Sequence, residues 1–175
     1  MVWHNDPFLG SSILPGRATY GILQKKIGEL DREIQGLALL QAHHALCLLK
    51  NSIAMPKLLY VFRTSPCFHI LLLDIFDDTL RRGLSLVLNV ELSDKQWEQA
   101  NLPVHMEGLG VRSAGMMATS GFLASTAATL PLQDAIFFMS VHGEEDPAVK
   151  SVLLVWKKTS QSTVPVNALE HIQKA

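Results

Sequence analysis

The stretch that decides the fold reads Ser93-Asp94-Lys95-Gln96-Trp97-Glu98-Gln99-Ala100-Asn101-Leu102-Pro103-Val104-His105-Met106-Glu107-Gly108-Leu109-Gly110-Val111-Arg112-Ser113-Ala114. Ser93 and Gln96 have the spacing of a capping box, in which each side chain accepts a hydrogen bond from the backbone N–H of the other residue. This pattern predicts a short helix that begins at Asp94, with Trp97 plugging the core.

The same stretch predicts where that helix ends. The residue before a proline is pushed out of the helical region, so Leu102-Pro103 acts as a stop. Gly108 and Gly110 then bracket Leu109, the second expected plug, in a turn that favours positive φ. A further helix of small residues is expected to follow.

Two apolar stripes precede this stretch, and their spacings of three and four each predict an amphipathic helix. The first stripe consists of Tyr20, Leu23, Ile27, Leu30, Ile34 and Leu37. The second consists of Leu39, Ala42, Leu46, Leu49 and Ile53. Pro56 is expected to kink or end the second helix, and apolar residues then continue towards Arg63.

A third long helix is predicted from Ser65-Pro66, because serine is a good N-cap and proline suits the first helical position. Its end is expected at Asn89. The stripe that it would bury consists of Leu73, Phe76, Leu80, Leu84 and Val87.

Asp77 and Asp78 lie on the polar side of this third helix. Polymerases use an Asp-Asp pair on a tight β-hairpin to hold two metal ions. Adjacent residues of a helix point about 100° apart, which does not suit that role. We therefore interpret both carboxylates as helix surface, in i,i+4 pairs with Arg81 and Arg82, and expect no catalytic residue and no enzyme activity.

The chain after the glycine turn predicts shorter helices. Small residues from Ser113 to Leu130 favour close packing, and Pro131 is expected to begin a new helix that reaches Met139. An acidic loop follows over residues 142–147, and then an amphipathic helix over Ala148–Lys158.

The predicted fold class is all-α: a bundle of about three long helices, followed by shorter packed helices, with a short hairpin or strand at the amino terminus. Four segments result. They are an irregular segment over 1–16, the helical bundle over 17–92, a downstream helical segment over 93–158, and a polar linker with a frayed helix over 159–175.

Composition limits the classes of function. The chain has 175 residues, of which 48% are hydrophobic, and a net charge of −1, so it is globular and carries no global basic field. Two cysteines without a signal peptide predict reduced thiols and an intracellular location, cytoplasmic or nuclear and not secreted. No apolar run approaches the ~20 residues of a membrane span, so no membrane partner is expected.

Four residues could form a structural zinc site: His44, Cys47, Cys67 and His69. The alternative is that the cysteines are ordinary core residues and the histidines lie at the surface or at caps. The paired C-x-x-C spacing of zinc sites is absent, so the alternative is favoured and neither metal nor cofactor is predicted.

Several cations could meet phosphates. Lys57 and Arg63 flank Tyr60 and Phe62, and nucleic-acid platforms combine charge with aromatic rings in this way. On these residues alone, a helix end packed in the core with a basic rim in water is favoured over a binding site. The chain has no P-loop and no nucleophile elbow.

Three groups of residues, in this order and spacing, resemble reverse transcriptases of LINE-type, non-LTR retrotransposons. The first group is Leu48-Leu49-Lys50-Asn51-Ser52-Ile53-Ala54-Met55-Pro56-Lys57-Leu58-Leu59-Tyr60 with Arg63-Thr64-Ser65-Pro66-Cys67. The second is Phe76-Asp77 with Leu80-Arg81. The third is Trp97, Gln99-Ala100, Leu102-Pro103, Gly108-Leu109-Gly110 and Ser113-Ala114.

The resemblance covers roughly Phe8 to Leu132 and corresponds to the thumb and the helical segment after it, with residues 1–16 as a remnant of the palm. It implies that the polymerase aspartates are missing and that the domain derives from a truncated element. It also implies that Lys50, Lys57, Arg63 and Arg112 contact the phosphates of an RNA or DNA duplex. The sequence departs from the family at two positions. His105 stands where the family often has a basic residue, and Glu107 stands where the family usually has glycine.

These observations support two main hypotheses. The first is a catalytically inactive, retrotransposon-derived domain with weak, sequence-independent affinity for a template–primer duplex. The second is a helical protein–protein module, or a remnant without function, whose exposed apolar face would lead to self-association. A zinc-stapled bundle is the third alternative.

Overall fold

The computed structural model describes residues 16–68, 70–137 and 147–159. Every regular element in these ranges is helical, which confirms the all-α fold class. The elements are α1 (Arg17–Leu37), α2 (Ala42–Leu48), the π-helical turn η1 (Leu49–Ile53), α3 (Met55–Thr64), α4 (Leu71–Leu88), α5 (Asp94–Asn101), the 3-10 turn η2 (Val104–Met106), α6 (Ala114–Phe137) and α7 (Pro147–Thr159). The amino-terminal hairpin, the acidic loop as far as Asp146 and the last helix of the sequence-based prediction lie outside the described residues.

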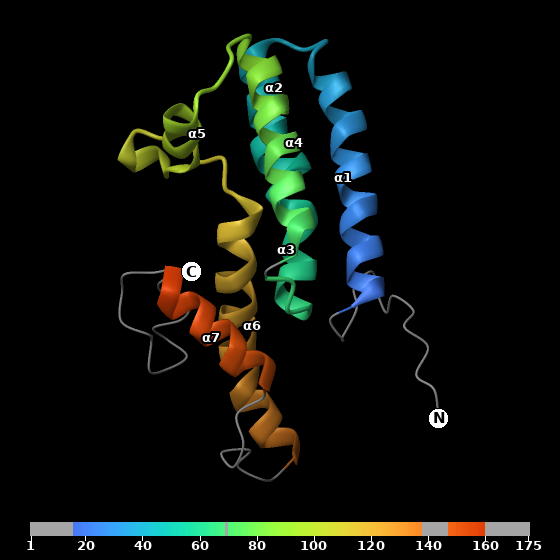
Figure 1. Ribbon diagram of the computed structural model, residues 1–175, viewed down its shortest axis with the longest axis vertical. Coiled ribbons are helices and arrows are strands. Elements are labelled where there is room, and N and C mark those ends of the chain that lie inside the picture. Colours follow the sequence, from blue (N-terminus) through green and yellow to red (C-terminus); the bar gives the residue numbers. More distant parts are fainter. Residues whose placement is uncertain (1–15, 69, 138–146, 160–175) are drawn as a thin grey trace.

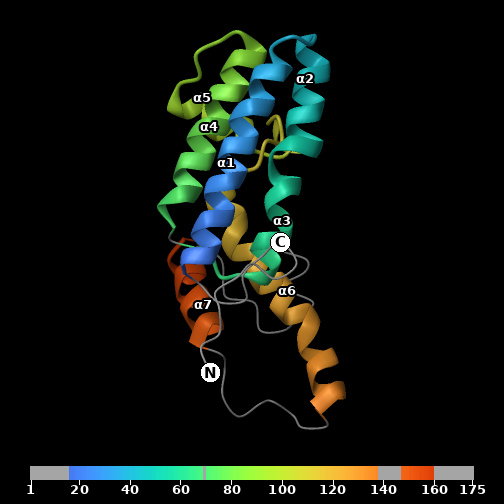
Figure 2. The same ribbon diagram turned by 90° about the vertical axis from the view of Figure 1, so that its right-hand side faces the viewer.

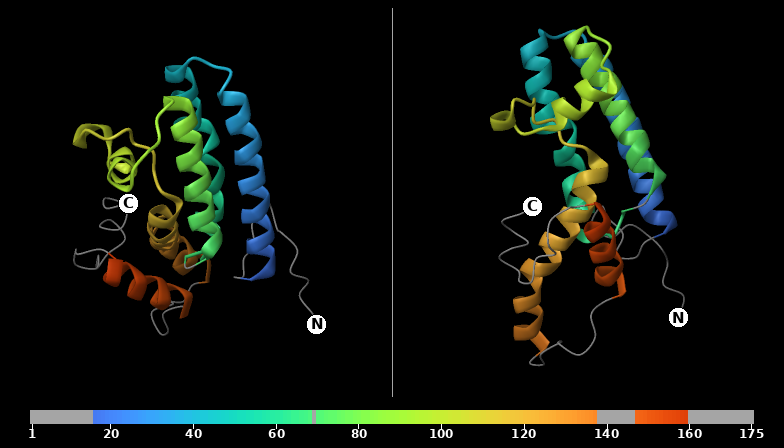
Figure 3. Two further views of the ribbon diagram at one scale, coloured as in Figure 1. Left: turned by 45° about the horizontal axis from the view of Figure 1, so that its top comes forward. Right: turned by 60° about the vertical axis from the view of Figure 1, so that its left-hand side comes forward.

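Three long helical segments form a bundle: α1, α4 and the continuous run of α2, η1 and α3 (Figure 1). Helix α5 stands beside one end of this bundle. Helix α6 begins against α3 and α4, and its second half extends past the end of the bundle (Figure 2). Helix α7 packs against α6, as both views in Figure 3 show.

The predicted stripes of α1 and α4 form the centre of the core. In α1, Leu23, Leu30, Ile34 and Leu37 are buried, and all five residues of the α4 stripe are buried. The two helices approach closely where Ile34 packs over Gly83, because a Cβ at residue 83 would lie 2.6 Å from Ile34 Cδ1. The period of the stripes therefore predicted this pair of helices correctly, although in the α1 stripe Tyr20 is 48% exposed and Ile27 is only partly buried.

The second predicted helix is more irregular than its stripe indicated. Leu39, Leu40 and Ala42 are exposed, whereas Ala45 and Leu49 are buried, and Leu46 and Ile53 of the predicted stripe are partly buried against the core. The helix widens into the π-helical turn η1, where the Ala54 N–H donates to the Leu49 carbonyl at 2.9 Å. The kink predicted at Pro56 falls at Ala54, just before α3, because proline is accepted in the first turn of a new helix.

The predicted helix start at Ser65-Pro66 is wrong. Ser65 is the extended C-cap of α3, and its N–H donates to the Val61 carbonyl at 2.9 Å. Helix α4 begins only at Leu71. Both Ser65 and Cys67 are fully buried, so core packing of the connection outweighs the local capping preference.

The signals around α5 are confirmed. Asn89 ends α4 in the left-handed conformation, with φ of 53°. The Ser93 N–H donates to Gln96 Oε1 at 2.9 Å and the Gln96 N–H donates to Ser93 Oγ at 3.4 Å, which completes the capping box. The helix ends at Asn101, directly before Leu102-Pro103.

The glycine turn returns the chain to α5. The Gly110 N–H donates to the Leu102 carbonyl at 2.8 Å, and the backbone of Gly110 has a φ of 67°. Gly108 is required for space, because a Cβ there would lie 2.0 Å from the Leu102 carbonyl oxygen. Glu107 has a φ of 63°, so a non-glycine residue adopts the left-handed conformation at the position where the resembling family usually has glycine.

The prediction that Pro131 begins a new helix is also wrong. Helix α6 runs without interruption for 24 residues and contains Pro131 in its interior. Leu130 keeps a helical backbone, since the bias of a residue before proline against helix is a preference and not a prohibition.

The start of α6 is held by a carboxylate from another helix. Asp77 of α4 accepts hydrogen bonds from Ser113 Oγ at 2.5 Å, from the Ala114 N–H at 2.6 Å and from the Gly115 N–H at 3.2 Å. The first N–H groups of a helix have no partner within the helix, and its N-terminus favours negative charge. Asp77 therefore caps α6 across the core.

The predicted i,i+4 pairs of α4 do not form. Arg81 instead contacts Asp94 at 2.8 Å and donates to the Leu92 carbonyl, and Arg82 lies 3.9 Å from Asp31 of α1. Asp77 is engaged by α6. The expectation that Asp77 and Asp78 lie on a helix and not on a hairpin is confirmed. The expectation that Asp77 belongs to the helix surface is wrong, because its side chain is half-buried and binds the start of α6.

Asp77→Ala removes three hydrogen bonds and leaves two backbone N–H groups of α6 without a partner. We expect the free energy of unfolding to fall by about 2–3 kcal/mol. Asp78→Ala is the matched control, because Asp78 is the exposed neighbour and should change stability by less than about 0.5 kcal/mol. Urea denaturation monitored by circular dichroism measures both, and equal effects would contradict the cap.

Candidate functional site

A groove runs along the face where α6 packs on η1 and α3. It consists of two adjoining hollows, of about 310 and 510 Å³, that share Leu59, Arg112 and Met117. Lys50 lies in the first hollow, Arg63 lies in the second, and Arg112 lines both. The structure thus brings together three of the four cations that the sequence analysis singled out, and we name Lys50, Arg63 and Arg112 the groove cations.

Lys50 reaches the groove from the π-helical turn. Its side chain passes directly over Gly110, since a Cβ at residue 110 would lie 2.7 Å from Lys50 Nζ. Glycine is therefore required at position 110 for two reasons: the backbone has a positive φ, and the Lys50 ammonium group occupies the space of a Cβ. The glycine turn and the lysine form one local arrangement.

The groove cations have no carboxylate partner among the described residues. Arg63 is exposed in the last turn of α3, and Arg112 is exposed directly before α6. The one polar contact seen for Arg112 is weak, from its Nη1 to Met117 Sδ at 3.9 Å. Their charges thus face solvent along the groove and remain available to an anion.

The α6 wall of the second hollow is built from small residues. It consists of Ser120, Gly121, Ala124, Ser125, Ala128 and Thr129. Gly121 lets α6 approach α3, because a Cβ there would lie 3.3 Å from Phe62 Cβ. The α6 side of this hollow is therefore formed by small side chains, and Leu59 and Met117 supply its larger apolar lining.

Lys57, the fourth predicted cation, does not line the groove. It forms an ion pair with Glu33 of α1 and so ties α3 to α1. The aromatic platform is also not formed: Phe62 has an exposure of 0% and belongs to the core, whereas Tyr60 is 47% exposed. The burial of Phe62 agrees with the alternative favoured on these residues alone, a helix end packed in the core. The ion pair of Lys57 was missed, because its partner Glu33 comes from another helix.

The four-residue zinc hypothesis gains no support. Cys47 is exposed whereas Cys67 is buried, and His69 lies outside the described residues. Within the described ranges, no three His, Cys, Asp or Glu residues gather into a metal-binding group. Burial raises the pKa of the Cys67 thiol to about 12, which is the behaviour of a structural thiol.

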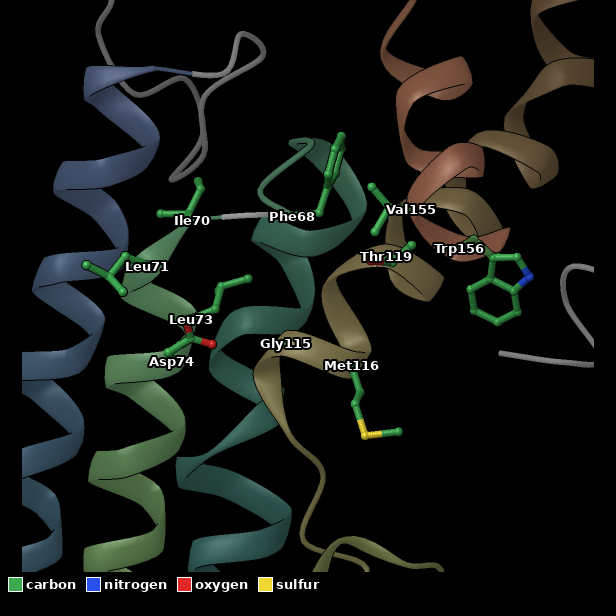
Figure 4. A pocket seen from close by; sticks show the side chains of 10 residues that line it. All are labelled: Phe68, Ile70, Leu71, Leu73, Asp74, Gly115, Met116, Thr119, Val155 and Trp156. Atoms are coloured by element: carbon green, nitrogen blue, oxygen red, sulfur yellow. The ribbon is translucent and has the colours of Figure 1, made fainter. Parts of the chain in front are cut away.

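A second, apolar groove was not anticipated from the sequence. It measures about 590 Å³ and lies where the starts of α4 and α6 meet α7 (Figure 4). Its lining residues are Phe68, Ile70, Leu71, Leu73, Asp74, Gly115, Met116, Thr119, Val155 and Trp156. Leu71 is 68% exposed and Met116 is 71% exposed, so large apolar side chains are open to solvent at this groove.

The helical run Ala42–Thr64 is long and apolar enough to cross a membrane, by its length and a mean hydropathy of 1.3 alone. One such helix is weak support for a span, because core helices have the same composition. Leu49, Leu58 and Phe62 of this run are fully buried in the bundle.

Comparison of the chain with protein-family models, with curated proteins and with solved structures finds no match.

The two thiols should differ sharply in reactivity. In the native protein at about pH 8 we expect one thiol per chain, that of Cys47, to react rapidly with a disulfide reagent. Both thiols should react after denaturation. Two rapidly reacting thiols in the native state would contradict the burial of Cys67, and Cys47→Ser should abolish the native reaction.

Proposed function

We propose that this chain is a retrotransposon-derived, thumb-like helical domain that lacks a polymerase active site and binds the backbone of a nucleic-acid duplex in the groove between α3 and α6. The observation that carries the proposal is the set of three groove cations that have no carboxylate partner in residues 16–68, 70–137 and 147–159. The motif resemblance adds that the same positions would meet phosphates in reverse transcriptases of LINE-type retrotransposons.

The geometry supports contact with backbone and not with bases. The groove carries charge and has small residues on its α6 side, whereas the aromatic side chain of Phe62 is buried in the core. Phosphate contacts carry no sequence information, so the binding is sequence-independent. Non-specific binding of this kind has dissociation constants of roughly 10⁻⁴ to 10⁻⁶ M at physiological salt.

The positions of Asp77 and Asp78 support the absence of polymerase chemistry. Two-metal catalysis needs carboxylates that converge on ions about 3.5–4 Å apart. Asp77 is already occupied by Ser113, Ala114 and Gly115, and Asp78 is a neighbouring residue of the same helix. Asp77 is therefore not free to hold a metal together with Asp78.

Removal of any groove cation should weaken duplex binding. With three phosphate contacts, the logarithm of the binding constant should fall against the logarithm of salt concentration with a slope of about −2.7. Lys50→Ala, Arg63→Ala and Arg112→Ala should each reduce the magnitude of that slope by about 0.9. Fluorescence anisotropy with a labelled RNA–DNA duplex, at several salt concentrations, measures this.

Two substitutions serve as controls for this experiment. Lys25 is exposed on α1, away from the groove, and Lys57 is engaged by Glu33. Lys25→Ala and Lys57→Ala should leave the slope within about 0.3 of the wild-type value. Equal losses in all five variants would indicate a general charge effect, and absence of binding at low salt would refute the proposal.

The apolar groove favours a second candidate function, self-association of the helical domain. Leu71 and Met116 expose large apolar side chains beside a cavity that no described residue fills. Burying such a side chain contributes about 1.5–3 kcal/mol. In this second proposal, the apolar groove is covered by a second copy of the chain.

Self-association predicts a mass that rises with concentration. In sedimentation equilibrium, Leu71→Gln should weaken dimer formation by about tenfold or more, because a polar side chain would lose its water at the interface. Leu39→Gln is the matched control, since Leu39 is 87% exposed in the turn between α1 and α2. A monomeric wild-type chain at every concentration would exclude this candidate.

A further inference from the structure

Two histidines at the start of α2 take no part in either groove. His43 and His44 are both exposed, and their Nε2 atoms lie 3.1 Å apart. The ring centroids are 3.8 Å apart and the ring planes are tilted by 44°. Adjacent helical residues normally diverge by about 100°, so this convergence of two ring nitrogens is a specific arrangement.

The separation of the two nitrogens suits a shared metal ion. With metal–nitrogen distances of about 2.0–2.1 Å, atoms 3.1 Å apart subtend an angle of about 98° at the metal. This angle lies between the values for neighbouring ligands in square-planar and tetrahedral coordination.

We propose that His43 and His44 bind one divalent transition-metal ion through their Nε2 atoms, with water in the remaining positions. Imidazole ligands suit copper, nickel and zinc, whereas Mg²⁺ and Mn²⁺ prefer oxygen ligands. Within the described residues no three-ligand group exists, so the site is open and exchanges its ion readily.

The neighbouring polar groups are consistent with a two-imidazole site. Cys47 lies one turn further along α2, and its Sγ accepts a hydrogen bond from Asn51 Nδ2 at 3.4 Å. The thiol is thus oriented towards the next turn and does not complete the site. Gln41, the N-cap of α2, makes no side-chain capping bond. The two rings therefore stand in solvent, where an incoming ion meets no steric barrier.

The site is tested by calorimetric titration of the full chain with Ni²⁺, which does not oxidise the exposed thiol of Cys47. We expect one Ni²⁺ bound per chain, in ready exchange with solvent, and no comparable binding of Mn²⁺. His43→Ala and His44→Ala should each lower the affinity for Ni²⁺ by about tenfold or more, because each removes one of two ligands. His105→Ala is the matched control, an exposed histidine in another part of the chain that should leave the affinity unchanged.

A second measurement identifies the atoms. In long-range ¹H–¹⁵N spectra, Zn²⁺ should shift the Nε2 resonances of two histidines, and both shifts should disappear in either variant. Failure to bind Ni²⁺, affinity within twofold of wild type in either variant, or an equal loss in His105→Ala would overturn the proposal. All three results are independent of duplex binding, since the groove cations remain in place. Far-ultraviolet circular dichroism confirms that the variants keep their helices.

Discussion

The contact on which the rest of the structure depends is the cap that Asp77 of α4 places on α6. Helix α6 is rich in Gly, Ser, Thr and Ala and has no strong apolar stripe, so its own sequence gives it little reason to begin at a fixed place. Burial raises the pKa of the Asp77 carboxyl, and hydrogen bonds from Ser113, Ala114 and Gly115 lower it in part. The start of α6 at Ala114 is thus fixed by a carboxylate whose burial is itself unfavourable. Both grooves follow from it, because α6 forms a wall of each.

The turn before α6 links the fixed start of that helix to the positions of Lys50 and Arg112. Gly108 lies against the Leu102 carbonyl, Gly110 has positive φ beneath Lys50, and Arg112 follows directly. Glu107 adopts the left-handed conformation at a cost of about 1–2 kcal/mol relative to glycine. The turn therefore keeps its shape despite the unfavourable residue, held by hydrogen bonds back to α5 and by the cap that follows it.

The sequence predicted what depends on neighbouring residues and failed where a partner comes from elsewhere in the chain. The α1 and α4 stripes, the Ser93–Gln96 box and the left-handed Asn89 were all predictable, because period, capping and turn chemistry are local. The start at Ser65 failed because that residue is buried by the core. The role of Asp77 could not be foreseen, since its partners lie 36 to 38 residues away. Likewise, Arg112 joined Lys50 and Arg63 only through the motif resemblance, and nothing local separates these three cations from Lys57.

The distribution of carboxylates explains why a chain of net charge −1 can still present a basic groove. Glu33 neutralises Lys57, Asp94 contacts Arg81, and Asp31 lies beside Arg82. Asp77 is used on the backbone of α6. The carboxylates of these contacts come from α1, α4 and α5. What remains between α3 and α6 is a local excess of positive charge, and at a Debye length of about 8 Å a phosphate in the groove responds to that excess and not to the net charge of the chain.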